Sequence, residues 1–235
     1  APDDGWGHMV LGDALVTWAS QARGGGWAST VQEDSWQIFF ERLRRAEDAL
    51  TTAARLLPES HLPWGRLIWS GIGLQIPLEE LTVRYDEGNR RAPFDNGLVS
   101  SALQMLCAKW YGSREHMFAY ARMVATEAPA GSPAVSVVAM AYIEDVVARQ
   151  RETDIEEALM SLEGPEVGTE LREAAERSIF HPDFVQDISG LGAANCFMVA
   201  FYGGHHYAEC HRVLTLLRGR YCSSPMDYLG DPGRM

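Results

Sequence analysis

The stretch WGRLIWSGI, residues 64–72, decides the fold class of this chain. One set of its residues falls at positions i, i+3, i+4, i+7 and i+8, namely Trp64, Leu67, Ile68, Gly71 and Ile72. Because an α-helix turns once in about 3.6 residues, this spacing places the whole set on one side of a helix. The stretch therefore predicts an α-helix with one buried face.

The same spacing returns in residues 99–110 and in residues 135–147. These apolar stripes are wide enough to be buried between neighbouring helices. No stretch alternates apolar and polar residues over the length of a strand, and no hairpin turn separates two β-branched runs. We therefore expect an all-α fold of stacked antiparallel helix pairs without a significant sheet.

Further helices are expected at both ends of the chain. The apolar pattern predicts one over residues 8–22 and a longer one from Glu33 to Leu57. Residues 194–217 read as two helices separated by Gly203-Gly204. Thr153 and Glu156 have the spacing of a capping box, which predicts a helix beginning after Thr153.

Prolines that follow helices recur at a nearly constant interval. Pro58, Pro93, Pro129 and Pro165 are separated by 35, 36 and 36 residues. Each interval has room for two helices. A repeat of about 34 residues that holds two helices is typical of tetratricopeptide units, because one helix pair cannot bury its apolar face without a stacked neighbour.

The segment from Pro63 to Pro93 resembles a degenerate tetratricopeptide unit. Trp64 and Leu67 lie early in its first helix, Tyr85 lies in the second, and Ala92-Pro93 closes the unit. The segment departs from the pattern at Ile68, where a small residue is expected, and at Pro77, which interrupts the turn between the helices.

Residues 107–113, 117–121 and 128–132 are also similar to a group of uncharacterised actinobacterial proteins with tetratricopeptide-like helices. The resemblance covers roughly residues 45–220. It implies a helical-repeat fold and a cytoplasmic location, and it implies no activity.

We expect a single helical-repeat domain over residues 1–235. Its expected parts are an N-terminal helix pair, three repeat-like pairs, C-terminal helices and a tail, at residues 1–58, 59–165, 166–225 and 226–235. The chain begins at Ala1, so removal of an initiating Met, removal of a signal peptide and a cut from a longer chain all stay open.

The charge of the chain limits its partners. It has 235 residues with 20 basic and 32 acidic side chains, a net charge of -12. This charge repels phosphate backbones and anionic lipids, so we expect neither nucleic acid nor a membrane as partner. Residues 144–187 hold 13 acidic and 4 basic side chains, a net charge of -9, which leaves -3 for the rest. A protein partner that docks near this segment is expected to be basic.

The densest group of reactive side chains is the segment HHYAECH, residues 205–211. On a helix, His205 would share a face with Glu209, and His206 with Cys210, so each pair could offer two ligands to one metal ion. Zinc needs three or four ligands, and packing and helix capping explain the segment equally well. We therefore predict no metal and no cofactor.

No motif for zinc proteolysis, serine hydrolysis or nucleotide binding occurs in the sequence. A stack of helix pairs does offer a concave groove in which uncommitted polar and aromatic side chains can bind a partner. The residues predicted to do so are Arg66, Trp69, Gln104, Lys109 and Asn195. In contrast, Trp18, Trp27 and Trp36 are expected to be core or capping residues.

The sequence favours a non-enzymatic protein-interaction or scaffold module that binds a peptide or partner protein in this groove. One alternative is an enzyme or small-molecule binder of a specialised pathway, with a pocket near Trp110 and Tyr111. Another is an oligomer-forming module with an exposed stripe that pairs with a second copy.

Overall fold

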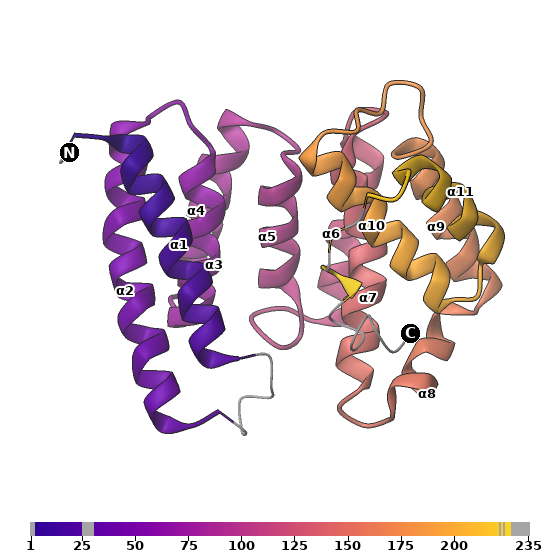
Figure 1. Cartoon of the computed structure of the whole chain (residues 1–235), viewed down its shortest axis with the longest axis horizontal. Coiled ribbons are helices and arrows are strands. Elements are labelled where there is room, and N and C mark those ends of the chain that lie inside the picture. Colours follow the sequence, from indigo (N-terminus) through magenta and orange to yellow (C-terminus); the bar gives the residue numbers. More distant parts are fainter. Residues whose placement is uncertain (1–2, 25–30, 221, 223, 227–235) are drawn as a thin grey trace. The chain divides into compact units, whose positions relative to one another are not determined.

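The computed structural model describes residues 3–24, 31–220, 222 and 224–226. About 75% of the chain is helical, and the described residues contain no strand (Figure 1). The prediction of an all-α fold is confirmed. The chain divides into two compact units, residues 1–105 and 106–235, which we call unit 1 and unit 2.

The described residues of unit 1 form five α-helices, the last of which ends one residue beyond the unit boundary. They are α1 (Gly5–Arg23), α2 (Glu33–Leu56), α3 (Leu62–Leu74), α4 (Leu78–Arg91) and α5 (Asn96–Leu106). Helices α1 and α2 run antiparallel, and α2, α3 and α4 pack in sequence (Figure 1). The arrangement places α3 between its two chain neighbours.

The core of unit 1 follows from the apolar spacing. On α2 the buried residues recur every three or four positions, as Phe39, Leu43, Ala46, Leu50 and Ala53. They pack against Met9, Leu15, Val16 and Ala19 of α1 and against Leu67 of α3. This cluster fixes the three helices around one apolar core.

In unit 2, the residues that the structure describes between α6 and α11 form six α-helices and two short 3-10 helices. They are α6 (Arg114–Glu127), η2 (Pro133–Ser136), α7 (Val137–Arg149), α8 (Ile155–Leu159), η3 (Met160–Leu162), α9 (Pro165–Arg177), α10 (Ile188–Gly203) and α11 (Tyr207–Leu217). Helix α10 packs against α7 and α11. It is apolar almost all round, with Phe197 and Phe201 fully buried, as expected for a helix covered on several sides.

Most predicted helix ends lie within three residues of the observed ones. The first helix begins earlier than expected because the Asp4 carboxylate accepts a hydrogen bond from the Gly7 amide at 2.9 Å and caps it. The prediction of a capping box at Thr153 is wrong. Asp154 caps α8 instead, and its carboxylate accepts from the Glu157 amide at 2.9 Å.

The three tryptophans near the start differ in environment. Trp36 packs against the core of unit 1. Trp18 is 55% exposed, so the prediction of a core or capping position is wrong for it: its ring lies at the surface, 5.9 Å from the Arg42 guanidinium of α2. Trp27 and Gly25-Gly26 lie outside the described residues, as do residues 227–235 of the expected tail.

Each of the first two intervals between the recurring prolines holds two helices, whereas the third, from Pro129 to Pro165, holds η2, α7, α8 and η3. Helices α3 and α4 lie between Pro58 and Pro93, and α5 and α6 lie between Pro93 and Pro129. The boundary between the units falls at the end of α5, between Met105 and Leu106. Within the part of the chain that the structure describes, no helix combines the length and the apolar content that a membrane span requires.

Candidate functional site

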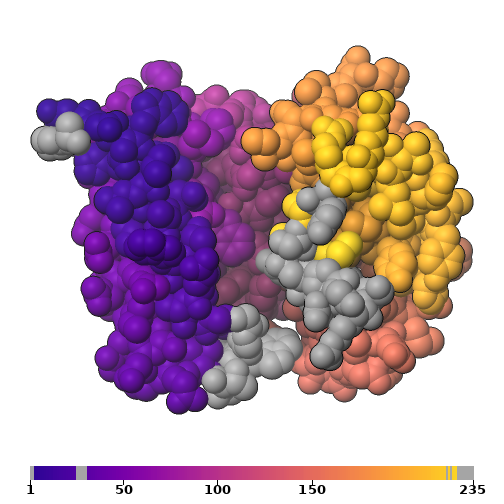
Figure 2. Space-filling model, in the orientation of Figure 1, coloured from indigo at the N-terminus to yellow at the C-terminus, as the bar shows by residue number. Residues whose placement is uncertain are grey.

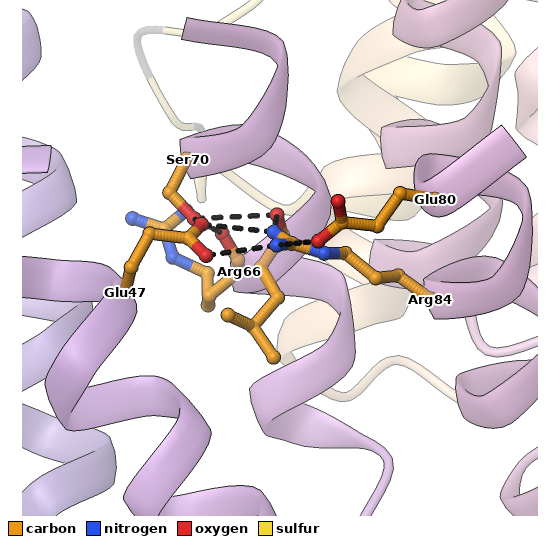
Figure 3. Close-up of polar contacts among 6 residues, drawn as sticks. Glu47, Arg66, Ser70, Glu80 and Arg84 are labelled. Carbon is orange, nitrogen blue, oxygen red and sulfur yellow. Dashed lines mark hydrogen bonds and ion pairs between the residues drawn. The ribbon is translucent and has the colours of Figure 1, made fainter. Parts of the chain in front are cut away.

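Arg84 lies at the centre of a polar network in unit 1 (Figure 3). It is on α4 and only 8% exposed. Its Nη1 and Nη2 donate to Oε1 and Oε2 of Glu47 on α2, both at 2.8 Å. Nη2 also donates to Glu80, one turn earlier on α4, at 2.8 Å. Planar two-point pairing of this kind fixes direction as well as distance, so Arg84 ties α4 to α2.

Helix α3 joins the same network through its backbone and one hydroxyl. Nη1 of Arg84 donates to the Leu67 carbonyl, and Ser70 Oγ donates to Glu47 Oε1. Figure 3 shows these groups pointing toward one another between the three helices. Burial opposes the charge of the Arg84 guanidinium, but its hydrogen bonds to Glu47 and Glu80 outweigh burial and raise its pKa above the ordinary value.

An open depression of about 420 Å³ lies directly over this network. We call it the α2–α4 groove. It is lined by Thr51, Ala54, Arg55, Trp64, Leu67, Glu80, Val83 and Arg84. Apolar and charged groups therefore meet in one concave surface.

Two of the lining residues give the α2–α4 groove its apolar character. Val83 on α4 is 59% exposed, which is high for an aliphatic side chain. Trp64 on α3 is half-buried, and its buried Nε1 has no hydrogen-bond acceptor among the described residues. The indole therefore contributes its ring, which also lies 5.1 Å from the Arg91 guanidinium. Apolar groups that stay exposed in a concavity are typical of binding surfaces.

Arg66 and Trp69 lie on α3 but do not line the α2–α4 groove. Arg66 Nε is 2.6 Å from Asp13 Oδ1 on α1. Burial lowers the pKa of Arg66, and Asp13 counteracts this. Trp69 packs against the core of unit 1. Both side chains are thus engaged in holding α3 to its neighbours.

Gln104 and Asn195 are buried. Gln104 is 3% exposed, and Asn195 has no exposed surface. Asn195 Nδ2 donates to the Leu191 carbonyl at 2.7 Å, and its Oδ1 accepts from the Cys222 amide at 3.3 Å. Neither side chain is accessible to a partner. On α5 and α10, the buried face is wider than the apolar stripe of the sequence indicates, and it includes these two polar residues.

Lys109 lies in unit 2 and pairs with a buried carboxylate. Its Nζ is 2.6 Å from Glu144 Oε2, and Glu144 is only 4% exposed. Arg66, Trp69 and Gln104 belong to unit 1, whereas Lys109 and Asn195 belong to unit 2.

Trp110 and Tyr111, around which the alternative pocket was expected, line neither the α2–α4 groove nor a second open depression in unit 2. That depression has a volume of about 520 Å³ and lies along α9. It is lined by Pro165, Glu166, Thr169, Glu170 and Glu173.

The histidine segment does not have the helical geometry expected of it. Helix α11 begins at Tyr207, and His205 precedes it with a φ of 58°. His205 Nδ1 lies 3.1 Å from Glu163, and His206 Nε2 lies 3.2 Å from the Leu162 carbonyl. The prediction that these two histidines lie on a helix is wrong. Within the described ranges, no three Cys, His, Asp or Glu side chains gather in a way that could hold a metal ion.

The central residues of the network were missed by sequence reasoning. Arg84 lies three residues after the buried Leu81, and Glu47 lies between the buried Leu43 and Leu50. The sequence does carry one signal for this network, because Arg84 and Glu47 are charged residues on the apolar sides of their helices. Such residues need a partner when they are buried, and here they are partners of each other.

A scan against protein-family models, a search of curated proteins and a search of solved structures found no match for this chain.

Proposed function

We propose that this chain is a non-enzymatic protein-interaction module that binds a peptide or helix of a partner protein in the α2–α4 groove. The observation that carries the proposal is the pair of apolar side chains, Val83 and Trp64, that stay accessible beside a fixed charged floor. Grooves between helices commonly take the apolar face of an amphipathic helix.

The floor of the α2–α4 groove supports this role because it is held in place before a partner binds. Arg84 is bonded to Glu47, Glu80 and the Leu67 carbonyl, so groups from three helices are ordered together. A preorganised surface loses less conformational entropy on binding. Thr51 and Arg55 on α2 are exposed at the rim, where they could hydrogen-bond to a peptide backbone or to an acidic side chain.

A tetratricopeptide-like stack and a cytoplasmic location are part of the same proposal. The two helices in each of the first two intervals between the recurring prolines support it. In this proposal the whole chain forms one helical-repeat domain.

We further propose that the partner is basic. Glu152, Glu156 and Glu157 are exposed, and Glu166 and Glu173 line the open depression of unit 2. Other acidic groups of residues 144–187 are already neutralised by basic residues from outside that segment: Glu144 by Lys109, Asp145 by Arg114, Glu170 by Arg122 and Glu176 by Arg212. The remaining carboxylates would steer a cationic protein toward unit 2.

The charge proposal is tested by the association rate. Because exposed charges are screened by salt, the rate should fall as the salt concentration rises, and replacing Glu152, Glu156 and Glu157 by Gln should lower it. If the association rate changes neither with salt nor with the three substitutions, the proposal of a basic partner is wrong.

The groove proposal is tested by photo-crosslinking in the native cells. A photo-reactive amino acid replaces Val83 in one variant and Leu78 in another. Leu78 is on the same helix and 37% exposed, but it does not line the α2–α4 groove. We expect position 83, and not position 78, to crosslink to one defined segment of a partner protein. The absence of a crosslink at position 83, or the same crosslinks at both positions, would overturn the proposal.

A further inference from the structure

Helix α1 is apolar on two opposite sides. On one side Met9, Leu15 and Val16 pack into the core of unit 1. On the other, four large apolar side chains are exposed: Trp6 by 56%, Val10 by 68%, Leu11 by 49% and Trp18 by 55%. Figure 2 shows α1 in indigo at the surface of unit 1. Large apolar side chains that stay exposed together on one side of a helix are typical of an interaction surface.

The exposed residues form one stripe. With a rotation of about 100° per residue, Trp6, Val10, Ala14 and Trp18 lie within about one third of the circumference of α1, a sector that also holds the exposed Thr17. The stripe runs from Trp6 to Trp18, which is twelve residue steps or about 18 Å along the axis. Two tryptophans at its ends are typical of residues that dominate binding energy.

The spacing of the stripe is symmetric about Gly12. Trp6 and Trp18 lie six residues before and after it, and Val10 and Ala14 lie two residues before and after it. If two copies of α1 pack antiparallel with a twofold axis near Gly12, Trp6 of each copy meets Trp18 of the other. The smaller Val10 and Ala14 then lie at the crossing, where the helices come closest. A surface that complements itself in this way suits a twofold dimer.

The charges at the two ends of the stripe are also complementary. The exposed Asp3 and Asp4 flank Trp6. At the other end, the Arg42 guanidinium lies 5.9 Å from the Trp18 ring, and its Nη1 donates to the Trp18 carbonyl at 2.6 Å. Arg42 forms no ion pair within the described ranges. In the antiparallel pair, the acidic end of one copy meets Arg42 of the other.

We infer that the outer face of α1 is a self-association surface that binds the same face of a second copy of this chain in antiparallel orientation. The inference goes beyond the proposed function, because the residues of the stripe are separate from those that line the α2–α4 groove. Its success or failure therefore leaves the groove proposal untouched.

Sedimentation velocity of the full chain tests the inference. The wild-type chain should form dimers in a concentration-dependent way up to about 100 µM. Val10→Glu with Trp18→Glu should weaken dimerisation at least about a hundredfold, because it places like charges in the interface. Ile188→Glu, which alters a residue that is 90% exposed in unit 2, should leave dimerisation unchanged. Circular dichroism confirms that each variant is folded.

A charge exchange tests the antiparallel orientation. Arg42→Glu should weaken the dimer, and adding Asp3→Arg should restore it, because the ion pair is rebuilt with reversed signs. A wild-type chain that stays monomeric would mean that another occupant covers α1, and would overturn the inference. Dimers that persist in the Val10→Glu, Trp18→Glu variant, or a charge exchange without recovery, would overturn it as well.

Discussion

Arg84 and Glu47 form a two-point ion pair that joins α4 to α2 across α3. Both guanidinium–carboxylate distances are 2.8 Å, and the two side chains are 10% and 20% exposed. The pair lies under the α2–α4 groove, so the groups that stabilise unit 1 also shape its candidate binding surface.

Removal of the Arg84 charge should strongly destabilise the chain. Arg84→Met leaves the Glu47 carboxylate without its cationic partner and removes the Arg84 bond to the Leu67 carbonyl, and breaking a buried pair from one side typically costs about 3–5 kcal/mol. We expect the free energy of unfolding, measured with urea, to fall by about 3 kcal/mol. Glu80 is 54% exposed, so Glu80→Gln should cost less than about 1 kcal/mol. Equal losses in the two variants would contradict this account of the network.

Glu170 should make the stability of unit 2 sensitive to acid. Hydrogen bonds from Arg122 hold the pKa of Glu170 below its ordinary value. The contribution of this carboxylate is therefore complete above the unfolded-state pKa of about 4.3 and is lost as the pH falls through the lower folded-state pKa. Glu170→Gln should lower the melting temperature at neutral pH, and the difference from wild type should vanish in acid.

Glu166→Gln is the control for this prediction. It removes an exposed carboxylate from the same helix, and Glu166 forms no ion pair among the residues that the structure describes. Its melting temperature should follow that of the wild type at every pH. A difference between wild type and Glu170→Gln that stays constant with pH would speak against the Arg122 contact.

Two glycines in helices should respond to Ala with opposite signs. A Cβ at Gly12 would lie 2.5 Å from Leu50 Cγ, and Leu50 is fully buried and cannot move aside. Gly12→Ala should therefore cost about 1–3 kcal/mol of stability. A Cβ at Gly192 of α10 would meet nothing within 4 Å, so Gly192→Ala should add about 0.5–1 kcal/mol. Urea unfolding measures both, and a stable Gly12→Ala variant would contradict the close packing of α1 on α2.

The four cysteines should differ sharply in reactivity. Burial raises the pKa of Cys107 and of Cys196 to about 12 and raises the pKa of Cys210, whereas Cys222 is exposed. Since the thiolate is the reactive form, a thiol reagent at about pH 8 should modify Cys222 quickly and the other three only after unfolding. Cys222→Ser should abolish the fast phase. A second fast thiol in the native chain would show that unit 2 is more open than described.

The fold class was accessible from the sequence because burial repeats with the period of a helix. Leu67, Ile68, Gly71 and Ile72 of the opening stretch are all buried, as their spacing predicted. The residue that caps a helix was harder to predict. At the start of α8, Thr153 and Asp154 are adjacent and both suit a cap, so spacing alone could not choose between them.

The candidate site was less accessible, because it depends on contacts between distant residues. Arg84 and Glu47 are 37 positions apart, and no local pattern brings them together. Gln104 and Asn195 resemble surface residues when each helix is considered alone, yet neighbouring helices cover them. Conversely, Trp18 resembles a core residue by type but is exposed. Burial of a polar or aromatic residue depends on which helices pack beside it, and a single sequence does not specify this.

Titration of the peptide crosslinked through position 83 tests the central claim most directly. The purified peptide is titrated into the wild-type chain, into Val83→Glu and into the matched variant Leu78→Glu, and the dissociation constants are compared. If the α2–α4 groove binds the partner, Val83→Glu should weaken binding at least about tenfold, or about 1.4 kcal/mol, while Leu78→Glu changes it less than about twofold. The same affinity for all three chains would contradict the claim.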